Sequence, residues 1–233
     1  MKFLINKRIE NKIRLYKFFP KEKADLVNII ASLLKDKIYD FNCIDTSNIT
    51  DMAYLFQFAC SKAGMERIGC QINVSTWDVS NVYNMRALFA NSVIDINPGI
   101  SDWNVSKVRY MENMFNSVDK FDANLENWDV SNVETMNFMF SNCYIFKGEG
   151  LKNWNVKNLT YSSYMFISCK TFNEDISNWN IDNIRYMQGM FNGCISFNQN
   201  LSKWKIYTSM TNIDKAFSSC LIHKSNKPQI IYC

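Results

Sequence analysis

Six tryptophans recur along this chain at a nearly constant interval. They stand 25 or 26 residues apart, at Trp77, Trp103, Trp128, Trp154, Trp179 and Trp204. A fixed period of this length is typical of repeat proteins, in which each repeat is one small unit that packs on its neighbours. The sequence therefore predicts a stack of similar coils.

Other apolar positions share the period. A valine or isoleucine follows each tryptophan by two residues, and a methionine follows most of them by eight. Twelve residues after five of the six come Phe89, Phe115, Phe140, Phe166 and Phe191. A degenerate copy at residues 44–56 has isoleucine in place of tryptophan. Together these copies predict about seven coils over residues 41–220.

The spacing within one coil predicts a short strand followed by a short helix. Trp128 and Val130 are two residues apart, which places both on the same face of an extended segment. The helix is indicated by apolar residues three and four apart, at Val133, Met136, Met139 and Phe140. Asn132 precedes this stripe, where its side chain would cap the helix.

Such a coil cannot bury its own apolar stripe, but stacked copies can cover one another. We therefore expect an α/β solenoid, a leucine-rich-repeat-like stack of about seven strand–helix coils. In this prediction the strands of successive coils pair in parallel, and the tryptophans form a ladder in the core. Burial would make each tryptophan worth about 1.5–3 kcal/mol.

The repeat string resembles that of a known family. The string Phe172-Asn173-Glu174-Asp175-Ile176-Ser177-Asn178-Trp179 matches the "FNxDISxWDVSNVxxMxxMF" repeat of the bacterial BspA-like leucine-rich repeat family. The segment 125–140 carries most of the remainder. The resemblance covers most of the chain and implies a binding scaffold without catalytic residues to carry over.

The ends of a stack need covers, and the sequence offers two. Residues 1–40 are expected to form an N-terminal cap, with strand segments at 2–17 and an amphipathic helix within 20–38; a membrane-surface helix is the alternative. Residues 221–233 are expected to form a C-terminal tail or cap, with a closing strand at Ile230–Cys233. Between Phe56 and Val74 an insertion of about seven residues predicts a loop.

Composition narrows the functional classes. With 26 basic and 22 acidic residues the net charge is +4, which argues against a dedicated polyanion binder. Residues 1–8 break off before any apolar stretch long enough for a secretion signal, and no 18-residue apolar run follows. We expect a cytoplasmic protein that contacts no membrane.

Cysteine and histidine give little support for a metal site. Four of the eight cysteines share one column of the repeat, at Cys143, Cys169, Cys194 and Cys220. Periodic placement predicts small buried side chains, although neighbouring coils could bring two sulfurs close enough for a disulfide. There is no C-x-x-C pair, and His223 is the only histidine. We therefore expect no metal and no cofactor.

No catalytic constellation emerges either. Nucleophilic catalysis usually needs a histidine base, and His223 lies in the tail. Carboxylates stand next to the tryptophan in three coils, at Asp78, Asp102 and Asp129, but later coils have Asn155, Asn180 and Lys205 beside theirs. A solvated polar face explains this better than an acid–base pair, so we expect no enzyme.

Two surfaces remain as candidate binding sites. The first is the outward strand face, acidic in early coils and basic in late ones, which would set partner orientation by charge. Its residues are Asp78, Asp102, Asn104, Glu126, Asp129, Asn155, Lys157, Asn180, Lys203 and Lys205. An ordinary hydrated surface is the alternative.

The second candidate lies on the helix side. Tyrosine and arginine, which are enriched in binding hot spots, gather there outside the apolar stripe. They are Tyr83, Arg109, Tyr110, Tyr161, Arg185 and Tyr186. These side chains could also stack the bases of single-stranded nucleic acid, or only flank the core.

The expected function is that of a non-enzymatic protein-binding scaffold that occupies a partner's surface. An inhibitor or adaptor would fit, for example a phage or mobile-element antagonist of a host enzyme. The alternatives are a nucleic-acid-binding repeat protein that uses the Tyr/Arg surface, and a surface adhesin. The sequence does not identify the partner.

Overall fold

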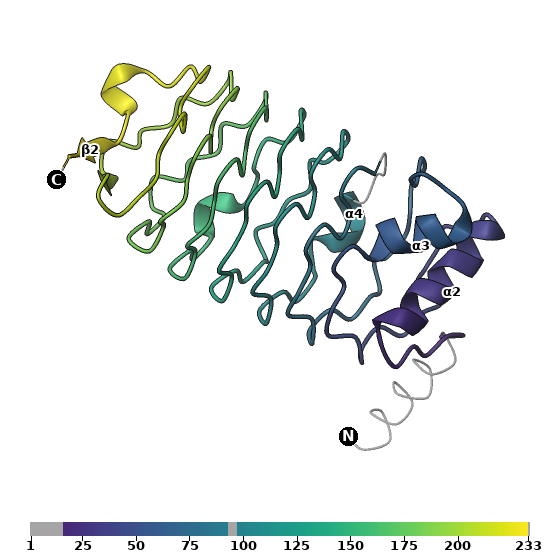
Figure 1. Cartoon of the computed structure of the whole chain (residues 1–233). Coiled ribbons are helices and arrows are strands. Elements are labelled where there is room, and N and C mark those ends of the chain that lie inside the picture. The colour runs from purple at the N-terminus through teal and green to yellow at the C-terminus, as the bar shows by residue number, and fades with distance from the viewer. Residues whose placement is uncertain (1–15, 93–96, 233) are drawn as a thin grey trace.

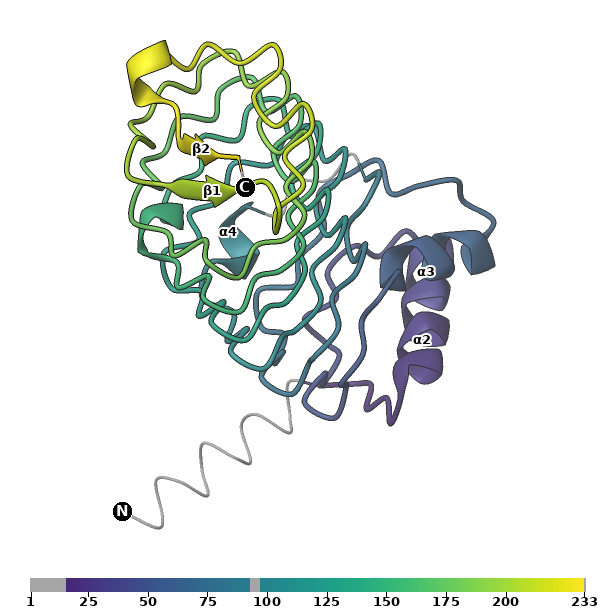
Figure 2. The same cartoon turned by 60° about the vertical axis from the view of Figure 1, so that its left-hand side comes forward.

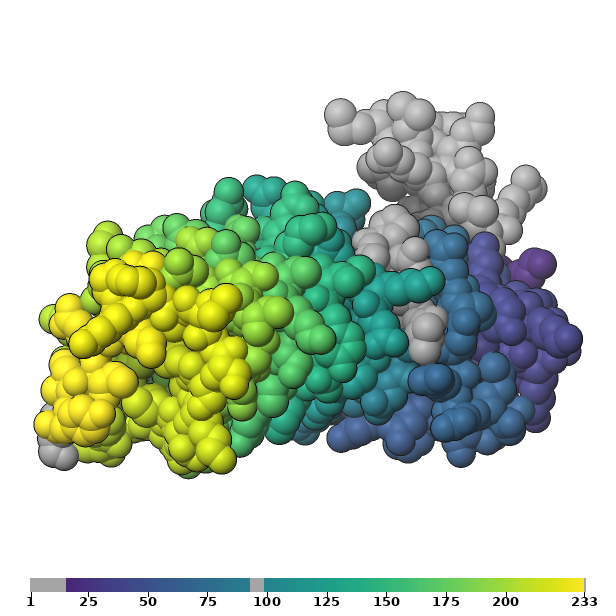
Figure 3. Space-filling view, turned by 90° about the horizontal axis from the view of Figure 1, so that it is seen from above, coloured from purple at the N-terminus to yellow at the C-terminus, as the bar shows by residue number. Residues whose placement is uncertain are grey.

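The computed structural model describes residues 16–92 and 97–232. Over these residues the chain winds into successive coils that stack along one axis (Figure 1). Single parallel bridges join positions about one period apart, as in Asn84–Tyr110, Tyr110–Thr135 and Thr135–Tyr161. In the space-filling view the colours follow one another along the molecule, so position in the sequence sets position along the stack (Figure 3).

The core runs through the middle of all the coils. The six tryptophans are only 3–4% exposed. Three successive pairs of rings stack, as for Trp128 and Trp154 with centroids 6.4 Å apart and planes 1° apart. The phenylalanines form a second ladder, with Phe115 and Phe140 5.7 Å apart. The tryptophans and most of these phenylalanines belong to one continuous hydrophobic cluster.

The strand–helix division of each coil is wrong. The segment from Val133 to Phe140 contains turns instead of a helix, and Thr135 within it bridges to the neighbouring coils. Its backbone amides donate outward to the next coil, from Met136 to Tyr161 at 2.8 Å and from Phe140 to Met165 at 2.9 Å. In a helix these amides would bond within the segment.

A left-handed residue explains why no helix forms there. Phe138, two residues before Phe140, has a φ of 56°, and Asn142, two residues after it, has a φ of 59°. A right-handed helix cannot continue through such a residue. Consecutive tight turns also place residues three or four apart on one side, so the apolar spacing of the sequence fits both structures.

The strand expected beside each tryptophan is also missing from most coils. In the described residues only the last tryptophan is followed by a strand, β1 (Lys205–Tyr207), which pairs in parallel with β2 (Gln229–Ile231). The closing strand that the sequence places near Ile230 is therefore β2. The two strands lie at the C-terminal end of the stack (Figure 2).

A pair of helices covers the other end. The segment 20–38 contains α2 (Lys23–Lys35), which buries Leu26, Ile30 and Leu34 on one face. It packs on α3 (Leu55–Ala63), and both lie beside the first coils (Figure 2). The strand segments expected at residues 2–17 fall outside the described residues, apart from 16 and 17.

The insertion between Phe56 and Val74, which was expected to form a loop, is partly helical. It begins with α3 and is not a loop throughout. Leu55, Phe56, Ala59 and Cys60 are buried on the face toward α2 and the core, and Gly64 ends the helix with a φ of 75°. The remaining short elements are α4 (Asn97–Ile100) and two 3₁₀ turns, η1 (Leu151–Asn153) and η2 (Lys224–Asn226).

Candidate functional site

The polar residues beside the tryptophans lie on the surface, in turns and in the irregular segments between them. Asp78 is half-buried, and the others are exposed: Asp102, Asn104, Glu126, Asp129, Asn155, Lys157, Asn180, Lys203 and Lys205. Only Lys205 of this set belongs to a strand. The expected strand face is therefore a row of turns and irregular segments.

These side chains shape the turns. Asp129 accepts a hydrogen bond from the Ser131 amide at 3.0 Å, and Asn104 and Asn180 accept in the same way from the residues two further on. Hydrogen bonds from the Ser131 side chain and amide lower the pKa of Asp129. Because an acceptor two residues before an amide favours a turn, the period of this column has a local structural cause.

The tyrosines of the second candidate surface form a row along the stack, which we call the tyrosine row: Tyr83, Tyr110, Tyr161 and Tyr186. Three of them are 43–44% exposed, and Tyr110 is half-buried. Tyr161 and Tyr186 stack with centroids 4.9 Å apart, and Tyr83 meets Tyr110 edge to face at 6.4 Å. Thr135 occupies the column between the pairs, so the structure makes two aromatic pairs.

Two arginines beside the row are neutralised by carboxylates of the following coil. Arg86 pairs with Glu112 at 2.8 Å, and Arg109 Nε lies 2.9 Å from Glu134 Oε1. The Arg86 guanidinium carbon also stands 4.3 Å from the centre of the Tyr110 ring. These pairs raise the pKa of both arginines, chiefly through the hydrogen bond to the glutamate.

Arg185 differs from them. Its Nη1 donates to two backbone carbonyl oxygens, those of Asp182 at 2.7 Å and Ile184 at 3.1 Å. Within residues 16–92 and 97–232 it forms no ion pair. Backbone carbonyls therefore hold the guanidinium in place, and no carboxylate of the described residues forms an ion pair with it.

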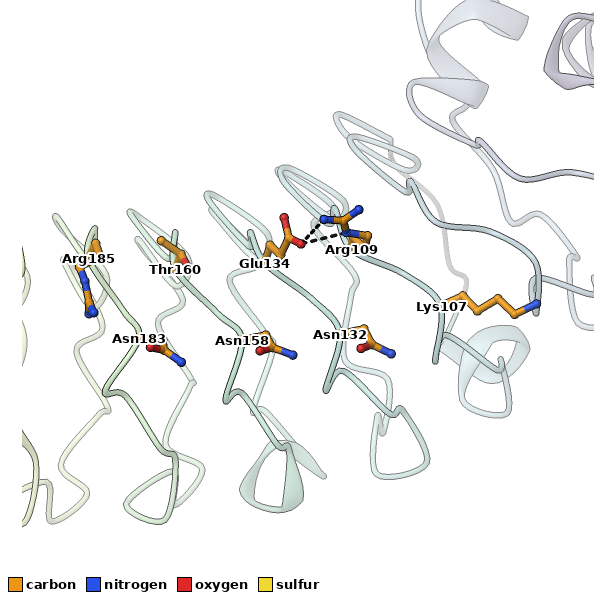
Figure 4. Close-up of a pocket in the computed structure, with 8 residues that line it drawn as sticks. All are labelled: Lys107, Arg109, Asn132, Glu134, Asn158, Thr160, Asn183 and Arg185. Carbon is orange, nitrogen blue, oxygen red and sulfur yellow. Dashed lines mark hydrogen bonds and ion pairs between the residues drawn. The ribbon is translucent and has the colours of Figure 1, made fainter.

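The sequence did not predict a surface hollow that lies next to the tyrosine row. It has a volume of about 730 Å³ and spans four coils. Arg109, Glu134, Thr160 and Arg185 follow one side of it, and Lys107, Asn132, Asn158 and Asn183 the other (Figure 4). The ion pair of Arg109 with Glu134 lies inside this hollow.

The asparagines of the hollow were expected to cap helices, and that role is wrong because no helix follows them. Each instead donates its Nδ2 to a carbonyl of the preceding coil, from Asn132 to Ser106 and from Asn158 to Ser131, both at 2.7 Å. These hydrogen bonds, which we call the asparagine ladder, link each coil to the one before it. The signal was present in the sequence as a periodic asparagine, but the partner lies a full period away.

The cysteine column is buried, as its period indicates. Cys143, Cys169 and Cys194 are inaccessible, and each donates its Sγ–H to a phenylalanine carbonyl of the preceding coil, at 2.9 Å for Cys169 and Phe140. Burial raises the pKa of each of these thiols. Cys220 is half-buried and donates more weakly.

Residues 16–92 and 97–232 contain no group of three or more histidine, cysteine or acidic residues that could hold a metal ion. No helix in this part of the chain has the length and apolar character needed to cross a membrane.

Stacked coils of one period, with their polar columns on the surface, define a repeat protein. The family model described as "Mycoplasma protein of unknown function, DUF285" matches residues 58–150 and 123–229, and the chain belongs to that family. Neither the curated proteins nor the solved structures gave a match.

Proposed function

We propose that this protein is a non-enzymatic scaffold that binds a protein partner through the tyrosine row and acts by occupying that partner's surface. The observation that carries the proposal is the two contacting tyrosine pairs on one side of the stack, in which three rings are exposed and that of Tyr110 is half-buried. Tyrosine supplies a large, rigid contact area at low entropic cost and is enriched in binding hot spots. An inhibitor or an adaptor works in this way.

The charges beside the row favour protein over nucleic acid. A strand of nucleic acid would need cationic groups free to meet successive phosphates. Arg86 and Arg109 are instead paired with Glu112 and Glu134. The Tyr161 and Tyr186 rings also stack on each other, which removes one face of each ring from those on which bases could stack.

The class of fold and the compartment belong to the same proposal. A leucine-rich-repeat-like solenoid of the BspA-like type is supported by the repeat string and by coils that bond to one another at each period. A cytoplasmic setting is supported by the buried cysteine column, whose thiols donate to carbonyls and must stay reduced to do so. A surface adhesin would place these thiols in an oxidising environment.

Affinity capture from a lysate of the native host tests the proposal. Tagged wild-type protein is compared with the double variant Tyr161→Ser/Tyr186→Ser, with and without nuclease. We expect a stoichiometric protein partner that resists nuclease and is lost with the double variant. The matched control is Tyr144→Ser, which removes an equally exposed tyrosine (41%) outside the row.

Two results would contradict the proposal. A partner that the double variant retains would exclude the tyrosine row as the contact surface. Co-purifying nucleic acid, with every protein lost on digestion and binding that falls steeply with salt, would support the nucleic-acid alternative.

A further inference from the structure

Arg185 stands where three surface hollows meet. It lines the hollow of about 730 Å³ that runs over the asparagine ladder. It also lines one of about 690 Å³ that includes Tyr161 and Tyr186. The third, of about 240 Å³, lies between Ile181 and Thr211. A ligand that follows this side of the stack therefore passes the guanidinium of Arg185.

The guanidinium is positioned but not neutralised. Within the described residues its hydrogen bonds go to the backbone carbonyls of Asp182 and Ile184, and both are donated by Nη1. An arginine carries five N–H donors, so Nε and Nη2 remain to bind a ligand. Arg109 occupies the same position three coils earlier, and its Nε and Nη2 both donate to Glu134.

The charge around Arg185 favours an acidic ligand. Lys107, Arg109 and Arg185 line the largest hollow against the single carboxylate of Glu134. No acidic residue lines the hollow beside Tyr161 and Tyr186. In the third hollow the carboxylate of Asp182 stands against the two cations Arg185 and Lys205, so basic residues also outnumber acidic ones there. Potentials across an interface tend to be complementary, so this side of the stack suits carboxylates.

The smallest hollow adds an apolar requirement. Its walls include the buried side chains of Ile184, Met187 and Ile206, and Met210 at its edge is 55% exposed. At about 240 Å³ it is smaller than the sites that hold whole drug-sized ligands. It suits a single aliphatic or aromatic side chain.

We propose that Arg185 is the anchor for an extended acidic peptide segment of the protein partner. One carboxylate of that segment binds the free edge of the Arg185 guanidinium, and an adjacent aliphatic or aromatic side chain enters the hollow beside Met210. This inference rests on the proposed function and specifies the chemistry of the partner. A polynucleotide lacks the apolar side chain that the small hollow accepts.

Selection from a displayed library of random 12-residue peptides tests the inference. The library is panned on the wild-type protein, and the strongest peptide is labelled for fluorescence anisotropy. We expect selected peptides to carry Asp or Glu next to an aliphatic or aromatic residue. Arg185→Gln should weaken binding about tenfold, because a charge-assisted hydrogen bond is lost.

Three comparisons keep the result interpretable. Arg67→Gln removes the same charge from an exposed arginine outside the three hollows and should leave affinity unchanged. Arg185→Lys keeps the charge without the planar fork and should bind with intermediate affinity. The selected peptide with its carboxylates replaced by amides should bind the wild-type protein about tenfold more weakly, a test that does not depend on the variants folding.

Selected peptides without acidic enrichment, or equal affinity for wild type and Arg185→Gln, would overturn the inference. So would Arg185-dependent binding of a single-stranded oligonucleotide that displaces the peptide. The proposed function fails separately: a lysate partner that is lost with Tyr161→Ser/Tyr186→Ser but kept by Arg185→Gln leaves the scaffold intact and removes only the acidic-peptide anchor.

Discussion

At the scale of the residue, the tryptophan joins two kinds of stabilisation. Its ring stacks on the next, and its Nε1 donates to a carbonyl of an earlier coil, as from Trp128 to Ile100 at 2.9 Å and from Trp179 to Leu151 at 2.8 Å. Trp103 is the exception, because its Nε1 finds no acceptor within the described residues. A buried ring with a satisfied polar atom combines apolar burial with a fixed orientation.

We expect Trp128→Ala to lower the free energy of unfolding by about 3–5 kcal/mol, because it leaves a cavity between stacked coils. Chemical denaturation followed by circular dichroism measures the change. Lys152→Ala, at an exposed position in the next coil, should alter stability by no more than about 0.5 kcal/mol. Equal stability of Trp128→Ala and wild type would mean that the tryptophan ladder does not contribute to the free energy of unfolding.

The buried thiols make stability depend on alkaline pH. Because burial raises the pKa of Cys169 in the folded state, the unfolded chain releases this proton first, near its ordinary pKa of 9.0. The contribution of the protonated Cys169 thiol to the free energy of unfolding is complete below pH 9 and is lost as pH rises above it. We expect Cys169→Ala to reduce the downward slope of stability against pH by about 1.4 kcal/mol per pH unit above 9.

Urea denaturation at a series of pH values from 7 to 10.5 gives both slopes. Cys43→Ala is the matched control, since it removes a thiol that is only half-buried. Parallel curves for wild type and Cys169→Ala would show that this thiol ionises equally in the folded and unfolded chains.

At the scale of the element, left-handed residues define the coil more than helices or strands do. They recur two residues before and two residues after the core phenylalanine, for example at Asn113 and Ser117 around Phe115 and at Tyr164 and Ser168 around Phe166. Each one turns the chain while alternate amides bond to the next coil. Asparagine is enriched in this conformation, whereas bulky residues such as tyrosine are outliers. We therefore infer that the packing of neighbouring coils holds these conformations in place.

Gly150 is a position where backbone conformation and space together exclude a side chain. Its φ is 91°, and a Cβ would stand 2.3 Å from the Glu126 amide nitrogen of the preceding coil. We expect Gly150→Ala to destabilise the protein by about 2 kcal/mol or more, because both the conformation and the contact become unfavourable.

Thermal and urea denaturation measure this loss. Gly69→Ala is the control, since a Cβ at Gly69 meets no atom within 4 Å and its φ is not in the left-handed range. A Gly150→Ala protein as stable as Gly69→Ala would mean that the two coils can separate there at little cost.

At the scale of the whole molecule, each coil depends mainly on its neighbours. Bridges join adjacent coils in order from Asp51 to Asn212, while the two ends are built differently, from α2 and α3 at one end and from β1 and β2 at the other (Figure 1). The stability of such a stack is approximately a sum of coil and interface contributions. Damage at one end should therefore remain local.

A chain that ends at Cys220 tests this locality, because it lacks β2. We expect the Ile206 amide in β1 to lose protection from hydrogen exchange, while the Met136 amide, bonded to Tyr161 in the middle of the stack, keeps its protection. Exchange followed residue by residue by NMR makes the comparison. Uniform loss of protection along the chain would show that the coils unfold as one cooperative unit.

Part of the candidate site was predictable. The period placed Tyr110, Tyr161 and Tyr186 in one column outside the core stripe, and they are at the surface in the structure. The sequence did not predict the ion pair of Arg109 with Glu134 or the asparagine-lined hollow. Nor did it predict that Arg185 forms no ion pair within the described residues. Each depends on a distance between residues about 25 apart, which spacing within one coil does not contain.

The sequence by itself determined the period and the core columns, because burial of one tryptophan and one phenylalanine per coil repeats wherever the same residues repeat. The tertiary structure decided how each coil turns. Residues three and four apart lie on one side both in a helix and in successive tight turns, so Val133, Met136 and Phe140 fit either. Backbone bonds to the next coil favour the turns, and those bonds exist only when the coils stack.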